Sequence, residues 1–295
     1  MISVAIIVVT YNSADCIEDL LDSLADSGAE AVVVVDNGST DDTASLVEGR
    51  PGVQLVRSTN VGYSGGINRG VRAVPDADAY LVLNPDLVAH PGVARVLAAA
   101  LADSEVGVAV PLVLDSDGRR QDSLRREPSI PRAVGLGWTG IAALSEYVTG
   151  DAAYRAPHDV DWALGAAIMF SRACYDAVGP WDESFFLYSE ETDFCLRARD
   201  AGWRTRFVPD AVVVHHEGGS GRSDATHAMQ IVNRVRLYAR RHSAPAGYVY
   251  LGLNVLSELT WIVRGHRQSR ASVRGLLIPR TRPPELGCGR SLLPR

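Results

Sequence analysis

The sequence predicts an α/β protein with a mainly parallel sheet, and three observations support this class. Over the first hundred residues, apolar strand-like runs alternate with segments of helical spacing, which is typical of βαβ units with right-handed crossovers. The stretch VVVVDNGSTDDT at 32–43 joins a continuous valine run to turn residues, as expected for a strand buried on both faces. A second apolar run, LVLNPDL at 81–87, contains an acid in the same position after its strand.

The order of the elements follows from these patterns. Runs rich in valine, isoleucine and leucine predict strands at 2–10, 30–36, 53–57, 79–84 and 106–114. Helical spacing and capping residues predict helices from about Ser13 and at 41–49, 63–74 and 91–101. The polar, poorly periodic stretch 115–149 predicts long loops, which are usually functional. Beyond it, elements are expected at 160–172, near Tyr175, at 204–216 (a strand) and at 225–241 (a helix).

The composition is that of an ordinary globular protein. Of 295 residues, 46% are hydrophobic and 22% are charged. The N-terminal stretch MISVAIIVVTYN lacks the basic leading region and cleavage site of a signal peptide, and the four cysteines are scattered as in reduced proteins. We therefore expect a cytoplasmic protein without a nucleic-acid partner, and its oligomeric state is left open.

The C-terminal part differs from the rest in charge. Residues 262–295 contain eight arginines and one acid, a net charge of +7, whereas the whole chain carries −6 and the remainder therefore −13. Before them, the apolar segment 248–263 is shorter than the roughly 20 residues of a membrane span. Its polar residues Asn254, Ser257 and Glu258 share one helical face.

These features predict two domains, 1–242 and a helical, arginine-rich extension at 243–295. The apolar segment is interpreted as a helix lying on the inner surface of the cell membrane, where the arginines would meet anionic lipid. The alternative is a helix packed on the first domain, with the arginines in solvent.

Candidate chemistry begins with Asp36 and Asp86, which follow apolar strands. Open α/β sheets bind ligands at the carboxyl ends of their strands, so two acids on neighbouring strands could form a crevice for a ligand and a divalent cation. Either acid could instead close a turn. The glycine-rich stretch NVGYSGGINRG at 60–70 could bring backbone N–H groups to a phosphate at a helix N-terminus, or could be a simple turn.

A second group of candidates lies later in the chain. YSEETDF at 188–194 places Glu190, Glu191 and Asp193 beside aromatic residues, where burial would raise a carboxyl pKa as a general base requires. The alternative is a solvated acidic helix start. His215 and His216 end an apolar strand and could bind metal or phosphate, or could be structural.

The resemblance to a known family rests on a series of motifs in one order. They are VVTYNS, VVDNGSTDDT, NVGYSGGINRG, LNPD, WALGAAIMFSR, VGPWDESFFLYSEETDFCLRARDAGW and HHEGGS. Together they resemble the family 2 inverting glycosyltransferases, which have the GT-A fold of nucleotide-diphospho-sugar transferases, a Rossmann-like α/β fold. The resemblance covers about residues 2–242. Within this family, the sequence looks most like the bacterial rhamnosyltransferase branch, which includes actinobacterial enzymes that rhamnosylate a polyprenyl-linked sugar.

The resemblance implies roles for the donor side. Asp36 would bind the uracil or thymine of a nucleotide-sugar donor. Asp86 would bind the metal, and Asn84 stands where the family usually has the first acid of its DxD motif. The other residues implied in nucleotide and phosphate binding are Thr10, Tyr11, Asn12, Asn60, Gly62 and Asn68.

The resemblance also implies the base and the acceptor side. EETD matches the family's Glu-Asp-x-Asp motif, so Glu191 stands at the base position and Glu190 is its competitor. His215, or alternatively His216, corresponds to the late histidine that binds metal or diphosphate. Trp162 and Gly165 fall in the acceptor-side segment.

The implied activity is inverting, metal-dependent glycosyl transfer with Mg²⁺ or Mn²⁺. A sugar, with rhamnose as first candidate, would move from a dTDP- or UDP-sugar to a hydroxyl on a lipid-linked cell-wall or polysaccharide intermediate. One alternative is a secondary-metabolite or peptide acceptor. Another is an inactive sugar-nucleotide-binding protein, which the departures at Asn84 and Glu191 would permit. A plain dinucleotide binder is disfavoured, because no GxGxxG follows the first strand.

Overall fold

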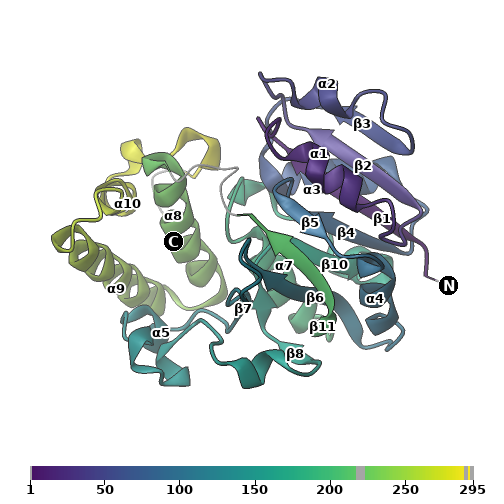
Figure 1. Ribbon diagram of the computed structural model, residues 1–295. Coiled ribbons are helices and arrows are strands. Elements are labelled where there is room, and N and C mark those ends of the chain that lie inside the picture. Colours follow the sequence, from purple (N-terminus) through teal and green to yellow (C-terminus); the bar gives the residue numbers. More distant parts are fainter. Residues whose placement is uncertain (1, 217–222, 289–291, 293–295) are drawn as a thin grey trace.

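The computed structural model describes residues 2–216, 223–288 and 292. A large twisted sheet flanked by helices forms one part of the molecule, and a group of C-terminal helices lies beside it (Figure 1). The main sheet contains β1 (Val4–Thr10), β2 (Ala31–Asp36), β3 (Val53–Arg57), β4 (Ala79–Leu83), β5 (Leu87–Ala89), β6 (Val106–Leu114), β8 (His158–Val160), β10 (Ala167–Ser171) and β11 (Arg204–His215). The helices are α1 (Ile17–Ser23), α2 (Thr43–Val47), α3 (Gly62–Ala73), α4 (Val93–Ala100), α5 (Ile130–Ala133), α6 (Arg172–Val178), α7 (Glu190–Asp200), α8 (Asp224–Arg241), α9 (Ala244–Val263) and α10 (Ser269–Leu277).

The strand order is β3-β2-β1-β4-β10-β6-β11-β5, and β8 also pairs with β11. Neighbours are parallel from β3 to β4 and between β6 and β11. The strand β10 is antiparallel to β4 and β6, and the short strands β5 and β8 are antiparallel to β11. The expected mainly parallel sheet is therefore confirmed, with antiparallel strands inserted in its second half.

One expectation about the sheet is wrong. Asp36 and Asp86 do not follow neighbouring strands, because β1 lies between β2 and β4. The chain first passes from β1 to β2 and β3 on one side of β1, and then crosses through α3 to β4 on the other side of β1. Thr10 at the end of β1 therefore lies between the two acids at the carboxyl edge of the sheet.

Glycines in α3 permit close packing of this helix on β1. A Cβ atom at Gly66 would overlap the side chain of Val9, and one at Gly70 would overlap Ile7. The glycine-rich stretch thus lies mostly within a helix, and these two glycines serve helix–sheet contact. They do not form a phosphate loop.

The hydrophobic core has three parts. One cluster lies between α1, α4 and the sheet, and a second lies on the other sheet face with α3, α6 and α7. The third joins α8, α9 and α10 and includes Val232, Tyr250 and Leu276. This third cluster takes in α8, which the predicted boundary at 242/243 assigned to the catalytic domain.

The stretch expected to be loops carries short elements. Two of them, β7 (Leu124–Arg125) and β9 (Trp162–Ala163), form a small separate sheet. The helix α5 packs on α9. Among the described residues, no helix combines the length and apolar character needed to cross a bilayer.

Candidate active site

Two of the predicted nucleotide-binding residues, Thr10 and Asp36, lie at the ends of β1 and β2. Thr10 pairs in register with Asp36, and its hydroxyl Oγ1 donates to Asp36 Oδ1 at 3.2 Å. The same oxygen accepts from the Ser39 hydroxyl, and the Ser39 N–H donates to Asp36 Oδ2 at 3.2 Å. Asp36 therefore does close the turn after β2, and these bonds also fix its carboxylate at the sheet edge.

The two residues after Thr10 have different surroundings. Asn12 adopts a positive φ of 51°. Its Oδ1 accepts from the Thr40 N–H at 2.8 Å, and its own N–H donates to the Ser39 hydroxyl at 2.9 Å. Asn12 thus ties together the loops after β1 and β2. The Tyr11 side chain is 51% exposed beside these loops.

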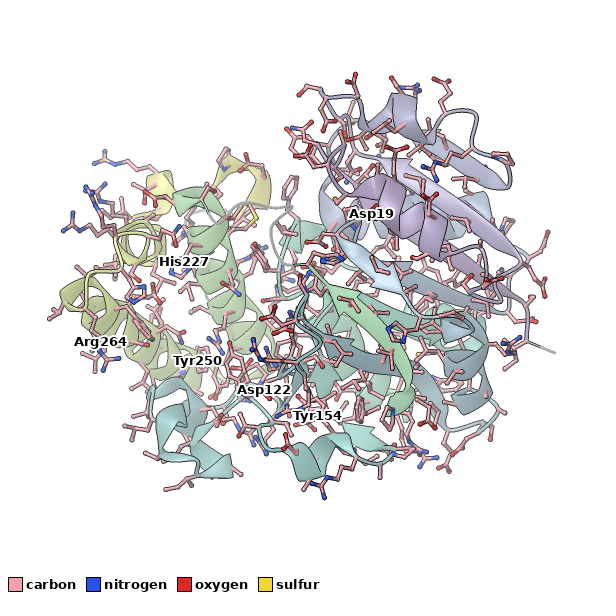
Figure 2. All side chains as sticks on the ribbon, in the orientation of Figure 1. Asp19, Asp122, Tyr154, His227, Tyr250 and Arg264 are labelled. Carbon is pink, nitrogen blue, oxygen red and sulfur yellow. The ribbon has the colours of Figure 1, made fainter. Side chains whose placement is uncertain are left out.

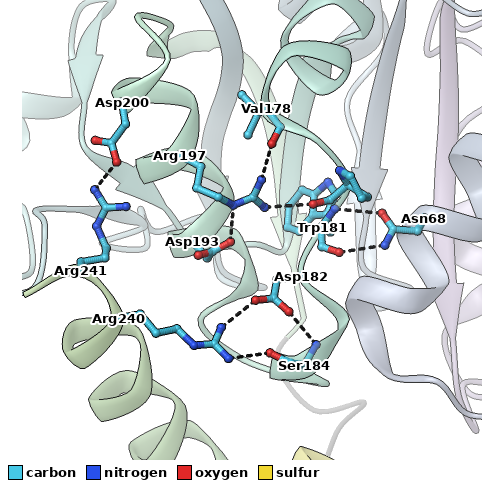
Figure 3. Close-up of polar contacts among 11 residues, drawn as sticks. Asn68, Val178, Trp181, Asp182, Ser184, Asp193, Arg197, Asp200, Arg240 and Arg241 are labelled. Carbon is cyan, nitrogen blue, oxygen red and sulfur yellow. Dashed lines mark hydrogen bonds and ion pairs between the residues drawn. The ribbon is translucent and has the colours of Figure 1, made fainter. Parts of the chain in front are cut away.

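The predicted glycine-loop residues have mainly structural contacts. Asn60 is exposed and its Oδ1 accepts from the Gly62 N–H at 3.1 Å. Gly62 has φ +80°, and a Cβ there would overlap the Phe186 backbone. Asn68 is buried, donates to the Trp181 carbonyl at 2.9 Å and accepts from the Trp181 N–H at 3.0 Å (Figure 3). In this geometry Gly62 and Asn68 hold the segment before α7.

The two predicted metal ligands meet although they are far apart in sequence. His215 at the end of β11 pairs with Leu87 of β5, which places its Nε2 3.4 Å from Asp86 Oδ1. The alternative ligand, His216, donates its backbone N–H to the Asp86 carbonyl, while its ring contacts Ser116. The geometry therefore favours His215 over His216. The rest of that motif, 217–220, lies outside the described residues.

The described residues contain no group of three or more His, Cys, Asp or Glu side chains arranged as metal ligands. Two protein ligands are nevertheless compatible with Mg²⁺ or Mn²⁺ at a diphosphate, because Mg²⁺ is often bound by one or two carboxylates together with substrate phosphates. Asp86 and His215 supply a carboxylate and an imidazole at one point, so the residues present fit such an ion.

Tyr63 connects the donor side to the acceptor side and was missed by the sequence reasoning. Its hydroxyl donates to Asn84 Oδ1 at 2.7 Å and lies 3.3 Å from the Gly165 carbonyl. Burial raises the Tyr63 pKa well above its usual value, and the charges of Glu190, Glu191 and Asp86 raise it further. The phenol therefore stays protonated.

Glu190 and Glu191 begin α7 and are both buried. Burial raises the Glu190 pKa well above its usual value, and the neighbouring charge of Glu191 adds to this. Burial also raises the Glu191 pKa to about 7, although nearby backbone N–H groups and Arg125 oppose the shift. Among the described residues, Oε2 of each glutamate lacks a hydrogen-bond partner. The alternative of a solvated acidic helix start is therefore wrong for these two residues.

The third acid of this motif has a structural partner. Asp193 Oδ2 accepts from Arg197 Nε at 2.6 Å, and the same guanidinium donates to the carbonyls of Val178 and Pro180 (Figure 3). Arg240 of α8 binds Asp182 and Ser184 in the same segment. The chain before the glutamates is thus held from two helices.

The backbone just before Glu190 is strained. Phe186, Tyr188 and Ser189 have φ values of 61°, 70° and 72°, which residues other than glycine rarely adopt. Such strain persists only where surrounding contacts enforce it, and it is common at functional sites. The buried Asn233 of α8 supplies these contacts, because its Nδ2 donates to the carbonyls of Phe185, Leu187 and Tyr188 at 2.6–3.1 Å. The sequence signal that could have identified Asn233 is its position as a polar residue in the apolar stripe of the helix expected at 225–241.

The acceptor-side residues lie against the glutamates. A Cβ at Gly165 would stand 3.2 Å from the Glu191 side chain, so Gly165 allows the glutamate its position. Trp162 in β9 is buried and donates through Nε1 to the Arg126 carbonyl at 3.0 Å. Its neighbour across the small sheet, Arg125, stacks on the exposed Tyr147 ring with 3.9 Å to the centroid.

Comparison with known proteins shows the family of this chain. Residues 5–155 match the model of "Glycosyl transferase family 2", and residues 137–243 match that of "Glycosyl transferase family group 2". An N-acetylglucosaminyl-diphospho-decaprenol L-rhamnosyltransferase of Mycobacterium tuberculosis is 30% identical and aligns over 91% of this chain and 94% of its own. The rhamnosyltransferase WbbL of Escherichia coli is 26% identical over 75% of this chain and 86% of its own.

Solved structures show the same fold. A mannosyltransferase of Pyrobaculum calidifontis, in complex with GDP-Man and Mn²⁺, superposes with a TM-score of 0.55 at 20% identity and covers 93% of this chain and 84% of its own. GalNAc-T7 with UDP, GalNAc and Mn²⁺ gives 0.60 at 16% identity over 80% of this chain, which spans about half (47%) of that larger protein. The GT-A fold implied by the motifs is confirmed.

The fold and its edge-of-sheet site define the class of protein: a GT-A glycosyltransferase. More narrowly, the chain belongs to glycosyl transferase family 2, and its relatives place it in the rhamnosyltransferase branch.

Proposed function

We propose that this protein transfers a sugar, with rhamnose as first candidate, from a dTDP- or UDP-sugar to a hydroxyl of a polyprenyl-linked sugar, with inversion and with Mg²⁺ or Mn²⁺. The observation that carries the proposal is the Tyr63 hydroxyl, which joins the two halves of the site. It donates to Asn84, two residues before Asp86 with its neighbour His215, and it lies 3.3 Å from the carbonyl of Gly165, which packs against the buried Glu191. The relatives named above add the sugar and the lipid-linked acceptor, since the mycobacterial protein is named for both.

The donor would lie along the carboxyl edge of β1, β2 and β4. Asp36 presents a fixed carboxylate to the imide N–H that uracil and thymine share, and Tyr11 offers a stacking surface. Asn84 Oδ1 is occupied by the Tyr63 hydroxyl, so its amide N–H₂ is left to donate to a diphosphate oxygen. This gives Asn84 a role that differs from metal ligation.

Asp86 and His215 would hold the divalent ion. When bound, it supplies Lewis-acid stabilisation of negative charge on the leaving diphosphate. Charged substrate and ion would enter a site that already contains two carboxyls of raised pKa, and the cation favours their ionised forms.

Glu191 is the proposed base. Its carboxylate takes the proton of the acceptor hydroxyl, while that oxygen forms a bond to the anomeric carbon. The bond from the anomeric carbon to the diphosphate oxygen breaks on the opposite face, and its electron pair leaves with the nucleoside diphosphate. A pKa of about 7 suits this task, because a useful fraction of the carboxylate is ionised at neutral pH and its basicity is higher than that of an ordinary glutamate.

The test is transfer of labelled rhamnose from dTDP-rhamnose to a short-chain polyprenyl-diphosphate sugar, with and without EDTA. Metal-dependent formation of a rhamnoside is expected, with the anomeric configuration opposite to that of the donor. Transfer to a peptide or soluble metabolite, with none to the lipid-linked sugar, would favour the first alternative acceptor class. Binding of the sugar nucleotide with no transfer or hydrolysis under any condition would favour an inactive binding protein.

A further inference from the structure

The helix α9 packs with its polar face toward the rest of the protein. Its buried positions are Gly247, Tyr250, Asn254 and Glu258, which share one side of the helix. Glu258 Oε2 pairs with His227 Nε2 of α8 at 3.0 Å (His227 and Tyr250 are labelled in Figure 2). The sequence analysis correctly placed Asn254 and Glu258 on one face. In an ordinary amphipathic surface helix, however, the polar face points to solvent and the apolar face is buried.

The opposite side of α9 is apolar and exposed. Tyr248, Val249, Leu256, Leu259 and Val263 recur at spacings of one, three, four or seven residues and form one stripe, here named the α9 outer face. Leu256 is 58% exposed and Val263 is 88% exposed. A contiguous apolar stripe of this kind on a folded protein marks an interaction surface.

Neighbouring segments extend this surface. The loop after α5 exposes Val134, Leu136 and Ile141, and α5 packs directly on α9. The helix α10 also packs on α9, and it ends with the exposed Leu277, which the exposed Ile278 follows. Figure 1 shows α9 at the outer edge of the molecule, away from the main sheet, with α5 next to it.

A run of positive charge follows α9 in the sequence and continues into α10. Arg264, Arg267, Arg270 and Arg274 are exposed, and none of them forms an ion pair with any residue that the structure describes. The Arg264 guanidinium lies over the Trp261 ring, 5.1 Å from its centroid. Aromatic residues next to arginine are typical of the boundary between lipid tails and headgroups.

We propose that the α9 outer face and its four arginines dock this protein on an anionic bilayer surface, with α9 lying flat in the interface. The apolar stripe would enter the boundary between headgroups and acyl chains, and the arginines would contact acidic headgroups. The charge of this surface favours lipid over a second copy of the chain. In a two-fold dimer with parallel α9 helices the two arginine runs would meet and repel, and in an antiparallel dimer the apolar α9 outer face would offer the arginines no acidic partner. An anionic bilayer offers acidic headgroups to all four arginines.

This inference rests on the proposed function, because the reason for docking is that a polyprenyl-linked acceptor is embedded in a bilayer. The helix α8 connects the docking surface to the site. It holds α9 through His227, and through Asn233 it holds the strained segment before Glu190. Docking therefore presents the catalytic glutamates at a fixed position relative to the bilayer.

The experiment is co-sedimentation of the full chain with vesicles, either neutral phosphatidylcholine or a mixture with phosphatidylglycerol. Binding to the anionic vesicles is expected at low salt, with a marked fall at about 0.5 M salt, where charges are screened within a few ångströms. Arg267→Gln should weaken anionic binding about fivefold. The matched control is Arg95→Gln, because Arg95 is also exposed but lies on α4, far from α9 in Figure 1, and this change should have no effect.

A second pair of variants tests the apolar stripe. Leu256→Ser combined with Val263→Ser should weaken binding by at least about tenfold at both salt concentrations, since the lost contact is with acyl chains. Both residues are exposed, so the fold should be unaffected, which thermal unfolding checks. Failure to bind anionic vesicles at low salt would overturn the proposal. So would a stable dimer that the serine variant dissociates, because the face would then be an interface between copies. The assay contains no sugar nucleotide, so its result is independent of the transfer assay.

Discussion

Replacing Glu191 by Gln should remove activity and, above neutral pH, increase stability. The structure gives the reason for both effects, since this carboxyl is buried and its Oε2 lacks a partner among the described residues. Loss of the base should lower turnover by about 10²-fold or more while leaving donor binding intact. Glu190→Gln is the matched control and should reduce turnover less. The reverse order would assign the base to Glu190.

The stability effect follows from the raised pKa. Burial shifts the Glu191 pKa from 4.5 to about 7, and such a shift corresponds to about 3 kcal/mol of unfolding free energy. Between these values the native state binds more protons than the unfolded chain. The contribution to stability is therefore complete below about pH 4.5 and is lost as pH rises through about 7. Glutamine does not titrate, so the variant should lack this part of the decline.

Two measurements check this reasoning. Urea unfolding of wild type and Glu191→Gln between pH 5 and 8 should give curves that diverge as pH rises, with the wild type losing more stability. In the wild type, kcat/KM should increase about tenfold from pH 6 to pH 8, as the fraction of ionised base rises. Parallel stability curves, or full activity in the variant, would refute the assignment of Glu191 as a buried base.

Three further predictions concern the donor site and the segment before the glutamates. Asp86→Ala should abolish Mn²⁺-dependent binding of dTDP or UDP by calorimetry without unfolding the protein, and an unchanged affinity would exclude Asp86 as a metal ligand. A thermal-shift panel should show stabilisation by dTDP or UDP with Mn²⁺, about 2.7 kcal/mol at a hundredfold excess over Kd; stabilisation by GDP alone would contradict the role of Asp36. Asn233→Ala should destabilise the protein by about 3 kcal/mol, because several buried carbonyls lose their donor, and should lower kcat more than it changes donor KM. An unchanged kcat would show that the strained segment is held without Asn233.

Much of the donor half could be predicted from local sequence. A continuous valine run such as 32–35 is stable only when both faces are buried, and the turn residues after it end the strand, so the position of Asp36 at a sheet edge follows from adjacent residues. The order of motifs was enough to indicate the family and the GT-A fold. The small strands β5, β7 and β8 were not predicted, and β9 was not separated from the element expected at 160–172, because strands of two or three residues carry almost no periodic signal.

The contacts of the site depend on the tertiary structure. His215 meets Asp86 because β11 pairs with β5, and no local pattern encodes a pairing between such distant segments. The role of Tyr63 and the clamp by Asn233 likewise require the helices α3 and α8 to be in place.

The sequence by itself determined which residues of α9 share a face, since that follows from 3.6 residues per turn. Which face points inward was decided only by the fold. Because His227 of α8 offers a partner for Glu258, the polar side is buried and the apolar side is left exposed. Periodicity fixes the two sides of a helix, but the partner that it packs against decides which side faces the core.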